Sequence, residues 1–116
     1  MKLVPNLQDD FLLVRVDEAR IDAAVAIRFK DAMRDIVDQP VTRVILDLSK
    51  VDFLDSSGLG AVVAVMKMLA PERRLELAGM TPTVGKVFAL TRMDSVFTLH
   101  AAVPKLSAAV EGRHAG

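Results

Sequence analysis

Residues 44–60 read VILDLSKVDFLDSSGLG, and this stretch decides how the chain folds. It opens with an apolar run, Val44 to Leu46, of the kind that forms a buried strand. It closes with Asp55 and two serines, which precede a second apolar run. A carboxylate or hydroxyl before an apolar run is a helix start signal. The stretch therefore predicts a strand, a loop and a helix whose entrance carries Ser56 and Ser57.

Two roles remain open for these serines. The first N–H groups of a helix lack intrahelical partners and carry partial positive charge, which suits a capping side chain and also suits a phosphate. In the first role Asp55 or Ser56 caps the helix, and such a cap typically contributes about 1 kcal/mol. In the second role Ser56 is a phosphorylatable switch. Capping serines are so common that the first role is the default for these residues taken alone.

The rest of the chain alternates between strand-like and helix-like patterns. Branched residues at positions 11–16 predict a strand, which a short strand around Lys2 to Val4 would pair with. Asp22 is placed to cap a helix that ends near Gln39-Pro40, and residues 41–48 form the next strand. We expect the second helix to end near Ala70-Pro71 and a strand to follow at Arg74 to Ala78. A helix should then run from Thr81-Pro82 to about Thr91, followed by a strand at Ser95 to Thr98. A final helix is expected from Ala101 to Glu111, interrupted early by Pro104.

This order predicts an α/β fold with a mixed central sheet of about four to five strands flanked by about four helices. The 116 residues give room for one domain, 1–116, and 52% hydrophobic content gives it ample core material. We expect the last residues, 112–116, to fray.

Composition argues against several classes of function. The formal net charge is zero, so no overall field attracts nucleic acid or an anionic membrane. Without cysteine the chain forms no disulfide, and His100 and His114 lack the spacing of a zinc site. A nucleophilic serine needs a positioned base and an elbow motif, and neither pattern is present, so we expect no enzymatic activity, no cofactor and no metal. The most apolar run is interrupted by Lys67, and we expect a cytoplasmic protein.

The second helix is apolar on almost every side. The expected core face is Leu59, Val62, Val63, Met66 and Leu69, yet the other sides carry Ala61, Ala64, Val65 and Met68. Such a helix is either covered by its own protein or leaves a patch for a partner. Gly58 and Gly60 predict a close approach of this helix to the sheet.

Residues 44–60 closely resemble the signature of the bacterial STAS-domain, anti-sigma factor antagonist family. The resemblance extends over residues 11 to 100, through Ile21-Asp22-Ala23-Ala24 and through Thr81-Pro82 with Val84, Val87 and Phe88. The chain has Ala19 and Arg92 where the family often has glycine, so two positions suited to a left-handed backbone are replaced.

The resemblance implies a regulatory cycle. Ser56 corresponds to the serine that an anti-sigma factor with serine kinase activity phosphorylates, and Ser57 to its less favoured neighbour. Unphosphorylated, the protein would bind that anti-sigma factor and free the sigma factor; phosphorylation would end binding, and a serine phosphatase would reset the cycle. The implied binding loop consists of Asp22, Asp55, Ser56, Ser57, Gly58, Leu59 and Gly60.

Two alternatives are consistent with the same fold. One is an accessory STAS subunit of a lipid transporter or scaffold complex, which contacts its partner without a phosphorylation cycle. The other is nucleotide binding, which is disfavoured because no phosphate-cradling glycine-rich loop is followed by lysine and serine or threonine.

Overall fold

The computed structural model describes residues 1–106. The elements, in chain order, are β1 (Leu3–Leu7), β2 (Leu12–Val16), β3 (Arg20–Ile21), α1 (Ala26–Ile36), β4 (Arg43–Asp47), β5 (Phe53–Leu54), α2 (Ser56–Leu69), β6 (Arg74–Ala78), α3 (Pro82–Leu90), a 3-10 turn (Met93–Ser95) and β7 (Thr98–His100). Within these residues no helix is long and apolar enough to span a bilayer.

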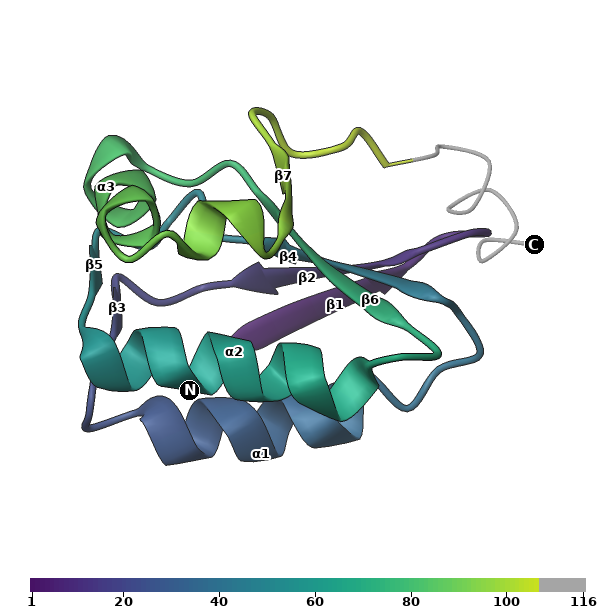
Figure 1. Ribbon diagram of the computed structural model, residues 1–116. Coiled ribbons are helices and arrows are strands. Elements are labelled where there is room, and N and C mark those ends of the chain that lie inside the picture. The colour runs from purple at the N-terminus through teal and green to yellow at the C-terminus, as the bar shows by residue number, and fades with distance from the viewer. Residues whose placement is uncertain (107–116) are drawn as a thin grey trace.

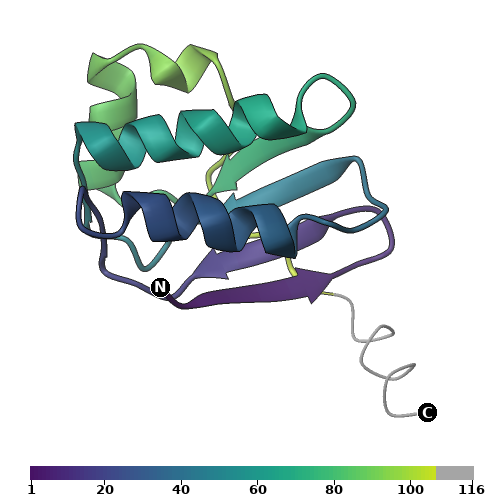
Figure 2. The same ribbon diagram turned by 90° about the horizontal axis from the view of Figure 1, so that it is seen from below.

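Five strands form the central sheet in the order β1-β2-β4-β6-β7. β1 pairs antiparallel with β2, and the remaining pairs are parallel, which confirms the predicted mixed sheet. Figures 1 and 2 show α1 and α2 side by side on one face of this sheet, with α3 at one end. The two-residue strands β3 and β5 form a separate ribbon at the end where α1 and α2 begin.

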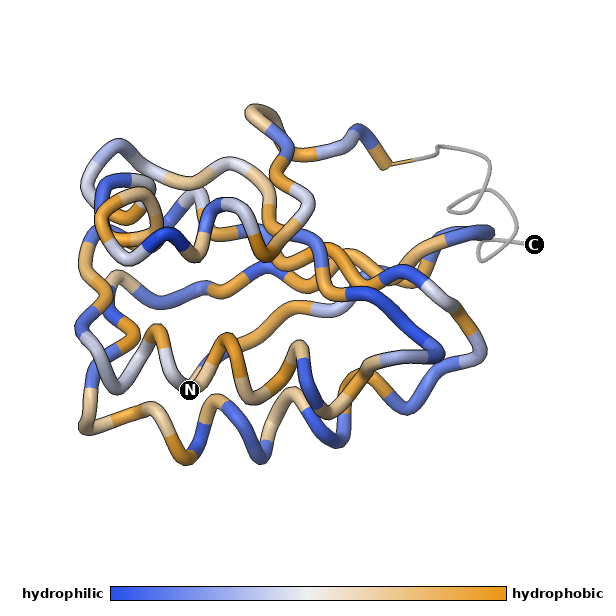
Figure 3. The backbone as a smooth tube through the Cα atoms, viewed as in Figure 1, coloured by the Kyte–Doolittle hydropathy of each residue, from blue (hydrophilic) through white to orange (hydrophobic). Residues whose placement is uncertain are grey.

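The core lies between the sheet and the two helices. Val44, Leu46 and Leu48 alternate toward this side and are fully buried, while Ile45 points to a small apolar cluster on the far face. Figure 3 shows that α1 alternates hydrophilic and hydrophobic residues, whereas α2 is hydrophobic over most of its length. α1 and α2 thus cover the apolar side of the sheet, and α3 adds Val84 and Phe88 to the same core.

The far face carries an ion cluster that is centred on the buried Glu76 and joins three strands. Glu76 is 2% exposed and accepts hydrogen bonds from Nε and Nη2 of Arg43 at 2.9 and 3.0 Å. Nε2 of His100 lies 2.7 Å from Oε1 of Glu76. The hydrogen bonds from Arg43 hold the pKa of Glu76 at about 2, against an ordinary value of 4.5. The cluster therefore fixes β4, β6 and β7 relative to one another at neutral pH.

The start of α1 differs from the prediction that Asp22 caps it. Asp22 Oδ1 accepts a hydrogen bond from Ala24 N at 3.1 Å, and the Asp22 carbonyl accepts from the N–H groups of Val25 and Ala26. These bonds close a separate turn, so the helix begins at Ala26, without a side-chain cap. Asp22 orders the approach to the helix but is not its cap.

The elements after α2 follow the predicted order, with one strand shifted along the chain. The strand at Arg74 to Ala78 and the cap of α3 by Thr81 with Pro82 following are confirmed. The strand expected at Ser95 to Thr98 lies further along the chain. A 3-10 turn takes up Met93–Ser95, and β7 is Thr98–His100. The structure has three α-helices within residues 1–106; residues 101–106 are not helical, and the remainder of the expected fourth helix lies outside the described residues. The tail 112–116, with His114, also lies outside them.

Arg92 adopts the left-handed conformation for which glycine is better suited, with φ 60° and ψ 18°. It is the sole non-glycine residue with positive φ in the described chain, so Ala19 does not share this conformation. Arg92 therefore holds a left-handed position after α3, at a conformational cost that glycine would not incur.

Candidate functional site

Asp55 organises the entrance to α2. It is the N-cap, and its Oδ1 accepts a hydrogen bond from Gly58 N at 2.8 Å. Its Oδ2 accepts a second bond from Ala23 N at 3.2 Å. One carboxylate thus accepts a hydrogen bond from an N–H group of α2 that has no partner within the helix. It also links the loop before α1 to the start of α2. Of the two predicted caps, Asp55 holds this position.

Gly58 lies on the inner side of the first turn of α2. A Cβ at this position would lie 2.0 Å from the carbonyl oxygen of Ile21, far inside van der Waals contact. The predicted close approach is therefore confirmed for Gly58, where the helix rests on the backbone of β3. The same prediction is wrong for Gly60, because Gly60 is on the outer side and a Cβ there would have no neighbour within 4 Å.

Ser56 and Ser57 occupy the first two positions of α2, and both are exposed. Because Asp55 already caps the helix, the Ser56 hydroxyl is not required for capping. The structure thus places an accessible hydroxyl at the positive end of a 14-residue helix, above a turn that other residues hold in place.

The neighbouring ribbon brings Asp22 to the same edge. β3 and β5 pair in parallel, with Arg20 opposite Phe53 and Ile21 opposite Leu54, so Asp22 and Asp55 follow adjacent strand ends. Asp22 Oδ2 accepts a hydrogen bond from Arg20 Nε at 3.2 Å.

Arg20 was not predicted as a site residue. Its guanidinium carbon lies 4.2 Å from the centre of the Phe53 ring. In the sequence, Arg20 shows only as a cation two residues before Asp22. The strand that carries it has two residues, too few to show the alternation of polar and apolar residues that predicts a strand. Arg20 supplies a positive charge, already paired with Asp22, at the edge that carries Ser56.

The predicted core face of α2 is confirmed, because all five of its residues pack in or against the core: Leu59, Val62, Val63, Met66 and Leu69. Leu59 is half-buried and packs on the core, as predicted, but Ala61 and Val65 are buried too. They are buried because α1 packs against that side of α2. Most of the apolar surface of α2 is thus covered by the chain itself; Met68 remains 38% exposed.

Residues 3–106 match the STAS domain. The chain is 31% identical over 98 residues to the putative anti-sigma factor antagonist BtrV of Bordetella bronchiseptica, which is 84% of either chain. Its fold is similar to that of an anti-sigma factor antagonist from Mycobacterium paratuberculosis, with a TM-score of 0.76, 26% identity and coverage of 96% and 92% of the two chains.

A further structural neighbour has been solved in two chemical states. The unphosphorylated form of the anti-sigma factor antagonist SpoIIAA superposes with a TM-score of 0.68 at 21% identity, over 99% of this chain and 98% of that one. The phosphorylated form, from Bacillus, gives a TM-score of 0.62 at 21% identity, over 97% and 99%. At this identity the likeness is one of fold.

Proposed function

The chain belongs to the STAS domain family, and on this premise we propose that it is an anti-sigma factor antagonist switched by phosphorylation of Ser56. The unphosphorylated form binds an anti-sigma factor that is also a serine kinase, and so releases the sigma factor. Transfer of phosphate to Ser56 ends binding, and a serine phosphatase restores it. The chain itself acts by binding, and the phosphoryl chemistry belongs to its partners.

One observation carries this proposal: the residue that caps α2 is not the residue proposed to be modified. Asp55 bonds to Gly58 N and Ala23 N, while Ser56 stands exposed beside it. A kinase can therefore reach the Ser56 hydroxyl without breaking the cap. The identity to a protein named as an anti-sigma factor antagonist supports the choice of partner.

A phosphate on Ser56 would change the surface more than the fold. It adds about 1.5 to 2 negative charges beside the carboxylates of Asp55 and Asp22. Its attraction to the helix terminus is worth about 0.3 to 1 kcal/mol, which is too small to rearrange a close-packed core. The packing of Gly58 against Ile21 lies beneath the modified residue and stays in place.

The effect on a complex is much larger. An unpaired charge that is buried against an acidic or apolar partner surface costs several kcal/mol. A micromolar complex has a binding free energy of only about −8 kcal/mol, so this penalty is enough to abolish it in the cell. The switch therefore works by electrostatic exclusion from the interface.

The test begins with tagged Ser56→Ala protein in the native cells, which should retain its kinase partner. Titration calorimetry with that purified partner then compares Ser56→Ala, Ser56→Asp and protein carrying phosphoserine at position 56. We expect the two charged forms to bind at least tenfold more weakly than Ser56→Ala. Ser95→Asp, a change at another exposed serine, is the control for added charge and should bind like the wild type; circular dichroism checks its fold, because Ser95 Oγ donates a hydrogen bond to the Arg92 carbonyl. Full affinity of the phosphoserine form would refute the proposal.

A further inference from the structure

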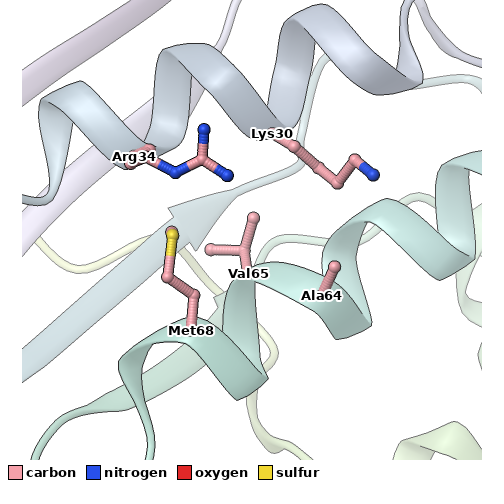
Figure 4. Close-up of a pocket in the computed structure, with 5 residues that line it drawn as sticks. All are labelled: Lys30, Arg34, Ala64, Val65 and Met68. Carbon is pink, nitrogen blue, oxygen red and sulfur yellow. The ribbon is translucent and has the colours of Figure 1, made fainter.

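A groove separates the outer sides of α1 and α2. We call it the interhelix groove and define it by five lining residues: Lys30, Arg34, Ala64, Val65 and Met68. Figure 4 shows the two cations reaching over the gap from α1, with Val65 and Met68 pointing toward it from α2. Its volume of about 140 Å³ is close to the ~150 Å³ of a cavity that holds benzene. It has room for one apolar side chain.

The groove is positively charged over an apolar floor. Both of its ionisable lining residues are cations, and no carboxylate lines it. The nearest counter-ion of Arg34 is Asp31, at 3.2 Å, but both side chains are 64% exposed. Such a surface pair is worth little and is easily exchanged. Asp35 and Asp38 do not line the interhelix groove. They line a neighbouring hollow together with Arg73.

Ser56 lies about two turns of α2 before the groove. Residues four apart form a row along a helix, and on α2 one such row runs through Ser56, Gly60, Ala64 and Met68. We call it the outer row. Gly60 has no neighbour for a Cβ, so the row is bare between the serine and the groove. On α1, Ile27 is 68% exposed one turn before Lys30.

We infer that the interhelix groove docks an acidic segment of the anti-sigma factor, with carboxylates beside Lys30 and Arg34 and one apolar side chain against Ala64 and Met68. The inference rests on the proposed function, since it assigns a second contact to the same partner. A rise of 1.5 Å per residue puts Ser56 about 12 Å from Ala64 along the helix. This separation exceeds the Debye length of about 8 Å at physiological salt, so repulsion between the exposed charges is largely screened and the groove adds affinity independently of the phosphate.

The first test reverses the charge of the groove. Lys30→Glu/Arg34→Glu protein is titrated with the purified anti-sigma factor at several salt concentrations, with Lys86→Glu, an exposed change on α3, as control. We expect the double variant to bind at least tenfold more weakly and with less salt dependence, and the control to bind within twofold of the wild type. Urea unfolding confirms that both variants fold. An unchanged affinity in the double variant, while Ser56→Asp still abolishes binding, overturns the inference and leaves the proposed function intact.

The second test identifies the occupant. Carbodiimide joins an amine to a carboxylate in direct contact, so it is applied to the wild-type complex and the joined peptides are sequenced by mass spectrometry. We expect Lys30 to be joined to aspartate or glutamate of the anti-sigma factor, next to an apolar residue. Lys30→Arg should lose this product and keep its affinity. Joining of Lys30 to a second copy of the chain, or to no partner carboxylate, contradicts the inference. If no kinase partner binds the wild type, both proposals fail.

Discussion

The inner and outer sides of the first turn of α2 differ in how firmly they are held. On the inner side, Gly58 touches the Ile21 backbone, and both oxygens of Asp55 accept hydrogen bonds. On the outer side, Ser56 and Gly60 are exposed. Neighbouring residues of this turn thus differ in their tolerance of chemical change. The inner residues fix the position of the turn, whereas the outer residues can be modified without displacing it. A modification on the outer side is then read by a partner rather than by the fold.

The largest effect is expected at Gly58. In Gly58→Ala the new Cβ would meet backbone, which has no rotamer to move aside, and we expect a loss of about 3 kcal/mol or more in the free energy of unfolding. Urea denaturation measures this loss. If Gly58→Ala were as stable as the wild type, the inner side would not be the rigid part of the turn.

A loss of similar size is expected at low pH, from a region remote from this turn. The folded-state pKa of Glu76, about 2, lies below its ordinary 4.5, so its ionised form stabilises the folded state. This contribution, about 3 kcal/mol, is present above pH 4.5 and is lost as the pH falls toward 2. Urea unfolding between pH 6 and pH 2.5 should show a steeper loss for the wild type than for Glu76→Gln. Equal slopes would contradict the assignment to Glu76.

An intermediate effect is expected at the cap. Asp55→Ala removes the acceptors for Gly58 N and Ala23 N and should cost about 1 to 2 kcal/mol. Asp55→Asn keeps one acceptor and should recover part of the loss. Thermal unfolding compares the two variants. Both lack the charge of the carboxylate, so a difference in their stability measures the hydrogen bonds of the cap and not a general effect of charge.

A smaller effect, of opposite sign, is expected at Gly60. Gly60→Ala adds a methyl group in open space on a helix and should stabilise the protein by up to about 1 kcal/mol. Urea denaturation beside Gly58→Ala gives the sharpest contrast, because the two changes are chemically identical and two residues apart. A destabilised Gly60→Ala would mean that the outer side is packed after all.

The smallest effect on stability is expected at Ser56. Ser56→Asp places a charge on an exposed first-turn position and should change the free energy of unfolding by less than about 0.5 kcal/mol. Its circular dichroism and urea midpoint are compared with those of Ser56→Ala. A large shift would mean that the switch acts on the fold instead of on binding.

The sequence predicted features that depend on local chemistry. The strand at Arg74 to Ala78, the cap by Thr81 and the entrance to α2 follow from residue patterns and capping groups within a few positions. Features set by tertiary packing were missed. Ala61 and Val65 are buried by α1, which the period of α2 alone does not report. Gly58 and Gly60 look alike in sequence, and only the position of β3 distinguishes them.

The central claim is that Ser56 carries a regulatory phosphate, and phosphopeptide mapping of the protein from its native cells tests it most directly. Samples from several growth conditions are compared with Ser56→Ala protein and with a phosphatase-treated sample. We predict stoichiometric phosphate on Ser56 that varies with growth condition and is absent from both controls. Absence of phosphate from Ser56 under every condition would contradict the account.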